Sequence, residues 1–270
     1  MAMPGVLELR LGVTRGALAP RAYTAAVNEI TLSLEELDRV VEPDPKSRVA
    51  WFVERTDWYE SGPTIQLRPD LQGAHRSTED LYRPGRALLA GITSLHTSPK
   101  IPDDFTERTV KRMAEVGALT QRHASGIQTI EVAELDHDNT STQIDERVDN
   151  NAKLAVAQAS LAYGSVVGKL DVISARTART RIGLVTGYGP PVTCMVDKID
   201  PEVYLHLFNS KVLVAGILKR NVSGQIIRIE ADSLELQQVP SSVEVEALRG
   251  ALPNPSGMSV AEYLEQQRGR

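Results

Sequence analysis

Five short apolar segments, separated by turn residues, occupy residues 164–238 and constrain the fold of this chain more than any other feature. Between the third and the fourth segments, Asp200 and Pro201 are the residue types that begin a helix, as its cap and its first position. This stretch therefore predicts a five-stranded β structure with one short helix. The five segments cover residues 165–173, 181–186, 192–196, 211–219 and 226–236.

This order of strands and helix is that of an OB-like β-barrel, a small sheet that closes on itself. Gly168 and Gly216 fall inside predicted strands, where a small barrel requires sharp bends or bulges. An open antiparallel sheet with the same number of strands is the alternative.

Residues 1–125 predict a different architecture, an α+β domain in which helices cover one face of a small antiparallel sheet. Leu7, Leu9 and Leu11 alternate with polar residues or glycine, which indicates a strand. Pro84 allows the second predicted helix to begin near residue 84. The remaining elements are expected as a helix over 20–42, strands over 48–54 and 63–69 joined by a loop over 57–62, and helices over 79–96 and over 104–117, the last capped by Asp103.

Trp51, Trp58 and Tyr59 lie around the second predicted strand. We expect them to pack in the core and in the hairpin. A small exposed aromatic patch that marks a partner site is the alternative.

Residues 126–163 form an acidic segment between the two predicted domains. Seven acidic against two basic residues give this segment a net charge of −5, equal to that of the whole chain. Its apolar residues predict two short strands and a helix over 145–160. We interpret the segment as a connector.

The sequence contains no familiar catalytic or metal-binding pattern, so we expect neither a cofactor nor a metal ion. The five histidines never occur at HxxxH spacing, and no GxSxG turn occurs. Cys194 lies within a predicted strand and is expected to be an unreactive core thiol. We therefore predict that the protein is not an enzyme. An enzyme whose carboxylates meet from distant parts of the chain is the alternative.

A basic loop between the first two strands of the predicted barrel is the strongest indication of a ligand. The loop between the fourth and fifth strands flanks the same ligand face in OB folds, and it also begins with basic residues. Few aromatic residues accompany these cations, although bases bind such faces by stacking on aromatic side chains. A solvated basic loop is one interpretation. The alternative is binding of single-stranded nucleic acid, with contacts at Arg176, Arg179, Arg181, Lys219 and Arg220.

Residues 239–270 contain three prolines and little apolar material for a core of their own. Ser259 and Glu262 form a capping box that predicts a short final helix. Because so short a helix is unstable alone in water, we expect it to dock on the body of the protein or on a partner. The side chains expected to contact a partner are Leu252, Met258, Val260, Tyr263 and Leu264.

Composition indicates a protein of the reducing cytoplasm without membrane association. The single cysteine cannot form an internal disulfide. No segment approaches the roughly 18 consecutive apolar residues that a membrane helix requires. The first residues also lack the pattern of a secretory signal.

Three segments carry a family resemblance: Gly164–Gly168 at the start of the barrel, Lys211–Gly216 in its fourth strand, and Met258–Leu264 in the tail. They resemble uncharacterised bacterial proteins with an OB-like barrel and an antitoxin-like C-terminal tail. Some of those proteins look like antitoxin-type partners of small nuclease toxins. The resemblance implies a tail that lies across a partner surface, and it supplies no catalytic residue. This sequence shows neither a DNA-binding ribbon nor a helix-turn-helix near its N-terminus.

Together these features predict a non-enzymatic adaptor or antitoxin-like regulatory protein, whose C-terminal tail docks on a protein partner or on another copy of the chain. Single-stranded nucleic-acid binding at the basic rim of the OB-like barrel is the alternative function.

Overall fold

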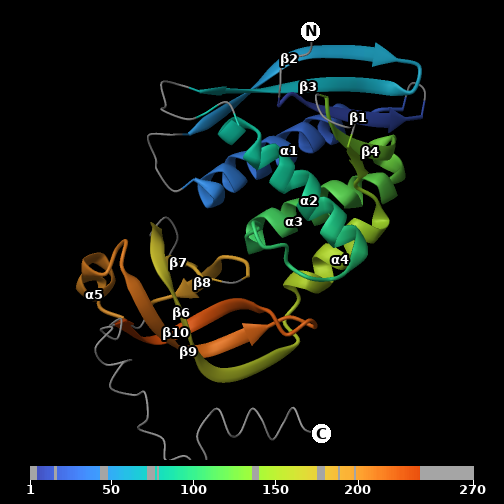
Figure 1. Cartoon of the computed structure of the whole chain (residues 1–270). Helices are drawn as coiled ribbons and strands as arrows, with labels where there is room; N and C mark the ends of the chain where they lie inside the picture. Colours follow the sequence, from blue (N-terminus) through green and yellow to red (C-terminus); the bar gives the residue numbers. More distant parts are fainter. Residues whose placement is uncertain are drawn as a thin grey trace, which may run out of the picture. The chain divides into compact units, whose positions relative to one another are not determined.

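Two five-stranded sheets and five α-helices make up the part of the chain that the computed structural model describes (Figure 1). The described residues are 5–14, 17–42, 48–71, 77, 79–135, 140–174, 180–187, 189–197 and 199–237. Among them, no helix has the length and apolar character needed to cross a membrane.

The elements follow one another in two groups. The first group is β1 (Leu7–Val13), α1 (Pro20–Val41), β2 (Val49–Tyr59), β3 (Gly62–Leu71), α2 (Arg83–Thr97), α3 (Glu107–Gln121), β4 (Ile127–Glu134), β5 (Ser141–Gln143) and α4 (Glu146–Val156). The second group is β6 (Ser160–Ser174), β7 (Arg181–Val185), β8 (Val192–Met195), α5 (Pro201–His206), β9 (Lys211–Arg220) and β10 (Ile226–Leu236). Single 3-10 turns at Glu79–Leu81 and His123–Ser125 precede α2 and β4.

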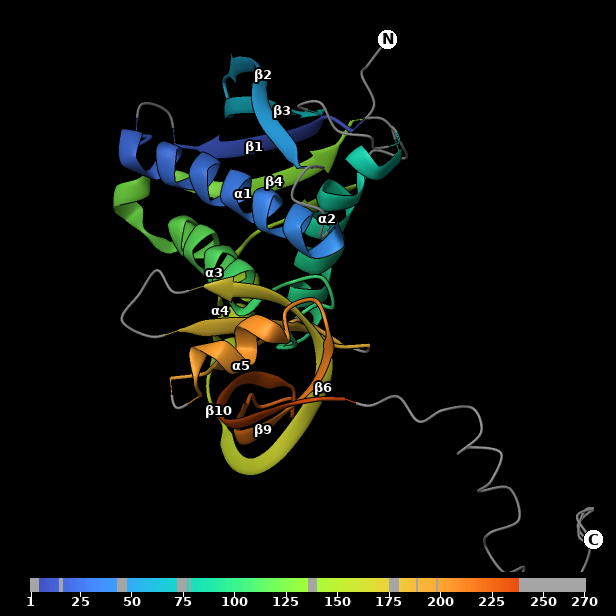
Figure 2. The ribbon, with the colours of Figure 1, turned by 90° about the vertical axis from the view of Figure 1, so that its left-hand side faces the viewer.

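The first sheet is antiparallel, with strand order β2-β3-β1-β4-β5. The alternating side chains Leu7, Leu9 and Leu11 of the central strand β1 are buried against the helices. The helices lie on one side of this sheet (Figure 2). The predicted α+β arrangement with helices on one face is therefore confirmed.

The acidic segment 126–163 belongs to this first group of elements. Strand β4 pairs with β1 along its length, and β5 extends the sheet beyond it. Helix α4 packs against α2 and α3. Its side chains Val148, Ala152 and Ala155 are fully buried in the same core. The structure thus differs from the connector that we inferred from charge, because a net charge reports the solvent face of an element and not the partners of its apolar face.

Several element boundaries also differ from the sequence-based prediction. Strand β6 begins at Ser160 instead of residue 165, and the helix expected over 145–160 ends at Val156. The expected loop over 57–62 is mostly strand: β2 runs to Tyr59 and β3 begins at Gly62, so only residues 60 and 61 form the turn. Helix α3 begins after Thr106, whose Oγ1 accepts the N–H of Thr109 at 3.2 Å. The predicted cap, Asp103, lies outside the helix.

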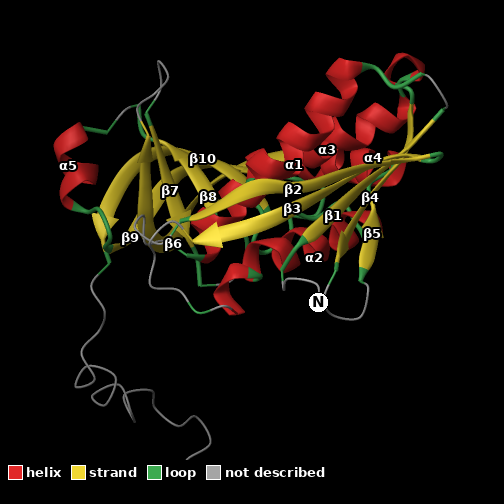
Figure 3. Cartoon of the chain, turned by 90° about the horizontal axis from the view of Figure 1, so that it is seen from above, coloured by secondary structure: helices red, strands yellow, loops and turns green. Residues whose placement is uncertain are grey.

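The second sheet has strand pairings that form a ring. Strand β6 pairs with both β7 and β9, β7 pairs with β8, and β10 connects β8 to β9. The β10–β8 pair is parallel and the others are antiparallel. All five predicted strands and the predicted helix α5 are present, and Figure 3 shows α5 at the outside of these strands.

Two glycines permit close backbone approach in this ring. A Cβ atom on Gly216 would lie 2.1 Å from the carbonyl oxygen of Glu230, and one on Gly168 would lie 2.9 Å from that of Val185. A side chain at either position therefore collides with a neighbouring strand rather than with a movable side chain. This is the physical reason for the glycines that the sequence places inside strands.

We expect Gly216→Ala to lower the free energy of unfolding by about 1–3 kcal/mol, because the added methyl group forces two paired strands apart. Urea unfolding of the full chain measures this change. Gly187→Ala is the matched control, since nothing lies within 4 Å of the added atom there. Equal stability of the two variants would contradict the close-approach explanation.

The loop between β9 and β10 joins the second sheet to the helices of the first. Asn221, which is 2% exposed, donates from Nδ2 to the carbonyl oxygen of Ala155 at 2.9 Å. The side-chain amide of Gln225 accepts from the N–H of Ile101 at 2.7 Å and donates to its carbonyl oxygen at 2.9 Å. The Oγ of Ser223 donates to the carbonyl oxygen of Pro99 at 2.9 Å. We call this set of contacts the hairpin clamp.

An ion pair and an apolar contact add to the hairpin clamp. Arg228 Nη2 lies 2.9 Å from both carboxylate oxygens of Glu107 at the start of α3. The side chain of Ile227 is buried in the core of the first group. Residues up to Leu236 accordingly form one compact unit, although sequence composition suggested separate domains.

We expect Asn221→Ala to destabilise the protein by about 1–3 kcal/mol, because it leaves the buried carbonyl of Ala155 and the amides of Ser223 and Gln225 without their partner. Ser223→Ala removes an exposed hydrogen bond and should cost less than about 1 kcal/mol. Chemical unfolding of both variants measures the difference. An Asn221 variant as stable as the Ser223 variant would show that the clamp contributes little.

Candidate functional site

The basic residues predicted to bind nucleic acid are only partly described. Arg181 is half-buried at the start of β7. Lys219 Nζ lies 2.5 Å from Glu230 Oε1, and Arg220 donates to the carbonyl oxygen of Gly224 at 2.8 Å. Arg176 and Arg179 lie outside the described residues, as do the tail residues Leu252, Met258, Val260, Tyr263 and Leu264.

Strand register brings Arg181 and Lys219 to one part of the ring, with an acidic residue between them. Arg181 is opposite Met195, which is opposite Glu230. Glu230 in turn holds the ammonium group of Lys219. The loop that begins at Arg220 is engaged in the hairpin clamp. The charge of Lys219 is thus compensated within the chain, whereas the bond of Arg220 to a carbonyl leaves its charge in place. Nucleic-acid binding by the five cations stays a prediction.

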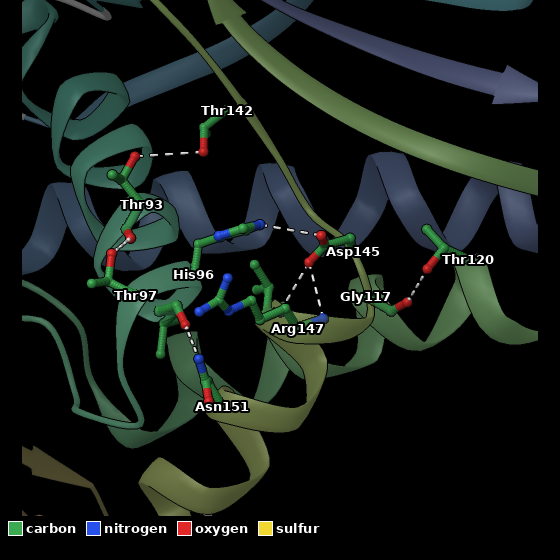
Figure 4. Close-up of polar contacts among 11 residues, drawn as sticks. Thr93, His96, Thr97, Gly117, Thr120, Thr142, Asp145, Arg147 and Asn151 are labelled. Carbon is green, nitrogen blue, oxygen red and sulfur yellow. Dashed lines mark hydrogen bonds and ion pairs between the residues drawn. The ribbon is translucent and has the colours of Figure 1, made fainter.

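A polar cluster joins α2, β5 and α4 (Figure 4). His96 Nε2 lies 3.1 Å from Asp145 Oδ2. The other carboxylate oxygen, Oδ1, accepts the N–H groups of Arg147 and Val148 at 3.0 and 3.1 Å, which caps α4. Nearby, Asn151 donates to the carbonyl oxygen of Leu95 at 2.7 Å. Because both oxygens of Asp145 have structural partners, we interpret the cluster as a helix cap and not as a catalytic pair.

Asp145 also makes the cap dependent on pH. Partial burial raises the pKa of this carboxyl, but hydrogen bonds from Val148 and His96 outweigh that effect, so its pKa lies below the usual value. We expect Asp145→Ala to cost about 1 kcal/mol and Asp145→Asn, which keeps a cap acceptor, to cost less. The stabilisation is present above the usual aspartate pKa and is lost as the pH falls through the lowered pKa. Urea unfolding at several pH values measures it, and an alanine variant with an unchanged pH profile would contradict this role.

The described residues contain no group of three His, Cys, Asp or Glu side chains positioned to hold a metal ion. Cys194 on β8 is fully buried in the core of the second sheet, and burial raises the pKa of its thiol to about 12. The prediction of a core thiol is confirmed.

We expect Cys194 to react with thiol reagents only after unfolding. The raised pKa keeps the thiol protonated near neutral pH, and the thiolate is the reactive form. Reaction with a disulfide reagent, followed in the native protein and in urea, measures this difference. Rapid labelling without denaturant would show that the second sheet opens readily.

A shallow surface depression, with an open volume of about 500 Å³, lies between α5 and β6. Leu205 is 58% exposed and Phe208 is 50% exposed. The neighbouring Tyr204 is buried in the core of the second sheet, which anchors the helix and leaves Leu205 outside. We call the lining residues the α5 patch: Asp171, Val172, Ile173, Leu205 and Phe208.

Asp171 gives the α5 patch a carboxylate. Burial raises its pKa above the usual value, although backbone hydrogen bonds and the charge of Lys169 act in the opposite direction. A cation that enters the depression would stabilise the ionised form of this group. Sequence reasoning missed this patch. The signal was present in residues 203–208, where a short helix and its end carry more apolar side chains than one buried side can hold.

Exposed aromatic side chains also lie on β2. Trp58 is 65% exposed and stacks on Tyr23 of α1, with ring centroids 6.4 Å apart. Tyr59 is 60% exposed, and Trp51 is half-buried against the first core. Trp58 and Tyr59 are therefore exposed and not packed in the core as expected, but as neighbours along a strand they lie on opposite faces of the sheet. A partner site at these residues stays a prediction.

No protein-family model matches this chain. The surfaces described above are the basis on which its function can be inferred.

Proposed function

We propose that this protein is a non-enzymatic cytoplasmic adaptor or antitoxin-like regulator that binds a protein partner at the α5 patch. The observation that carries the proposal is the surface depression of about 500 Å³ whose lining joins four apolar side chains to one carboxylate. Three of those apolar side chains, Val172, Leu205 and Phe208, are about half exposed. Clustered exposed apolar groups of this kind mark interaction sites on soluble proteins.

The apolar side chains and the carboxylate of the α5 patch indicate which kind of protein segment binds there. Burial of apolar surface stabilises a complex by about 25 cal/mol per Å², and a hydrophobic anchor in a cavity is a frequent centre of binding energy. Asp171 favours a cationic group beside that anchor, because the carboxylate is partly desolvated already. The expected ligand is a protein segment with an apolar side chain next to a lysine or arginine.

The tail is proposed to extend the contact with the partner. The amphipathic segment around Met258 and Tyr263 and the resemblance to antitoxin-like tails support this part of the proposal. We also propose that the ring of strands is an OB-like barrel. The strand order, the position of α5 between its third and fourth strands, and the close approach at Gly168 and Gly216 support it.

Affinity purification of the tagged full chain, with and without nuclease, tests the partner surface. We compare wild type with Leu205→Ser/Phe208→Ser and with the control Leu154→Ser, which changes a similarly exposed apolar side chain on α4. A stoichiometric protein that survives nuclease, stays with the control and is lost from the double variant would support the proposal. No retained protein, or equal retention by the double variant, would overturn it. Removal of residues 250–270 tests the tail separately.

Binding to the α5 patch should weaken as the pH falls through the raised pKa of Asp171, because the protonated carboxyl no longer attracts a cation. Asp171→Asn should bind the purified partner more weakly at neutral pH and should lose that part of the pH dependence. Calorimetric titration of both proteins over a pH series measures this effect. A wild-type affinity that is independent of pH would remove Asp171 from the recognition surface.

Nucleic-acid binding is the second candidate, and one observation favours it. Tyr163 lies on β6 and is 71% exposed. It is opposite Ile217 of β9, the strand that also carries Lys219, and Ile217 is opposite Glu230 of β10. Its ring is available for base stacking. If single strands bind there, Tyr163→Ala should weaken oligonucleotide affinity about tenfold or more, whereas Tyr59→Ala should not. Affinity that does not fall with added salt would exclude this function.

A further inference from the structure

Strand β2 lies at the edge of the first sheet. Among the described residues it pairs with β3 only, so its other side carries backbone N–H and C=O groups without a strand partner. The strand is eleven residues long, and residues 52–56 are all exposed. Edges of this length normally attract another strand unless charges, prolines or a covering element prevent pairing.

The exposed side chains of β2 are apolar at both ends of a charged centre. Phe52 and Val53 lie before the centre and Trp58 and Tyr59 after it, and all four are among the exposed large hydrophobic side chains. The register with β3 shifts between Val53 and residue 55, which marks a β-bulge. Regular pairing with β3 therefore covers residues 49–53 on one side of the bulge and residues 55–59 on the other.

Charge at this centre is self-complementary. Arg55 and Asp57 are opposite Gln66 and Thr64 of β3, on one face of the sheet, and their charged groups lie 2.7 Å apart. A twofold axis at Thr56 would place each Arg55 opposite Asp57 of a second copy. Opposite charges at directly paired positions stabilise an antiparallel pair.

We propose that β2 pairs antiparallel with β2 of a second copy of this chain about Thr56, which joins the two first sheets into one ten-stranded sheet. Regular pairing of the two copies covers residues 55–57 of each, because the bulge turns Val53 to the face opposite that of Tyr59. The pairing satisfies edge backbone groups of both copies. The pair is isologous, so it closes as a dimer and does not propagate.

Neighbouring registers are unfavourable. A one-residue slip of the pairing would set residues of opposite faces against each other. Moving the axis to Asp57 would restore the faces but would place two carboxylates directly opposite. The charge pattern therefore selects Thr56 as the centre.

Charge reversal tests the proposal through the oligomeric state of the full chain, measured by sedimentation velocity over a wide range of concentration. Wild type should dimerise. Arg55→Glu or Asp57→Lys alone should weaken the dimer about tenfold or more, because each places like charges opposite one another. The double variant Arg55→Glu/Asp57→Lys should restore it. A wild type that stays monomeric, or a dimer insensitive to the single reversals, would overturn the proposal.

Cross-linking provides a measurement that does not depend on charge. Thr56→Cys should form a disulfide-linked dimer under mild oxidation, because the axis brings the two positions together. Glu202→Cys, an exposed position on α5, is the control and should not cross-link. The buried native Cys194 should not interfere. Absence of the linked dimer in the Thr56 variant would exclude this register. Dimerisation and the α5 patch are independent, so failure of one leaves the other testable.

Discussion

The side-chain amides of Asn221 and Gln225 connect two hydrophobic cores. Residues 157–159, the Ser223–Pro99 hydrogen bond, the Glu107–Arg228 ion pair and the buried side chain of Ile227 add to this connection. Their hydrogen bonds to Ala155 and Ile101 are buried or partly buried. Breaking one of them leaves a buried polar group without a hydrogen-bond partner, which costs free energy. A flexible linker would let the two sheets move independently. The hairpin clamp instead makes them parts of one unit, and the positions of all other surfaces follow from it.

This constraint determines which surfaces remain for a ligand. The β9–β10 loop would flank the ligand face of an OB-like barrel, but here its polar groups contact the helices of the first part. Beside it, Lys219 is paired with the carboxylate of Glu230, and Arg220 donates to a main-chain carbonyl and keeps its charge. Exposed apolar side chains line the α5 patch and β2, and Leu161, Tyr163 and Val222 expose others beside the β9–β10 loop. The α5 patch joins such side chains to a carboxylate. For that reason we favour a protein partner over nucleic acid.

Local sequence patterns predicted most elements of both sheets. Strands β7 to β10 and helix α1 agree closely with their predicted ranges, because alternation and helical spacing are properties of neighbouring residues. Strand β6 begins at Ser160, five residues before its predicted start. The boundary errors at Tyr59 and Thr106 arose where turn residues suggested a stop although pairing or capping occurred further along the chain. The acidic segment was misassigned because its charges lie on faces away from the core, whereas β4 and α4 are held by apolar contacts with distant elements.

For the described residues, the sequence by itself determined the type and order of the helices and strands, the need for Gly216, and the burial of Cys194, since each follows from local spacing or residue size. The predicted final helix lies outside those residues. Only the tertiary structure decided what stays exposed. Trp58, Leu205 and Phe208 are residue types that usually lie in a core, and Arg220 is a type that often binds ligands. Whether such a side chain faces solvent, a partner strand or a carbonyl oxygen depends on segments far away in the sequence, and single-sequence periodicity carries no information about those neighbours.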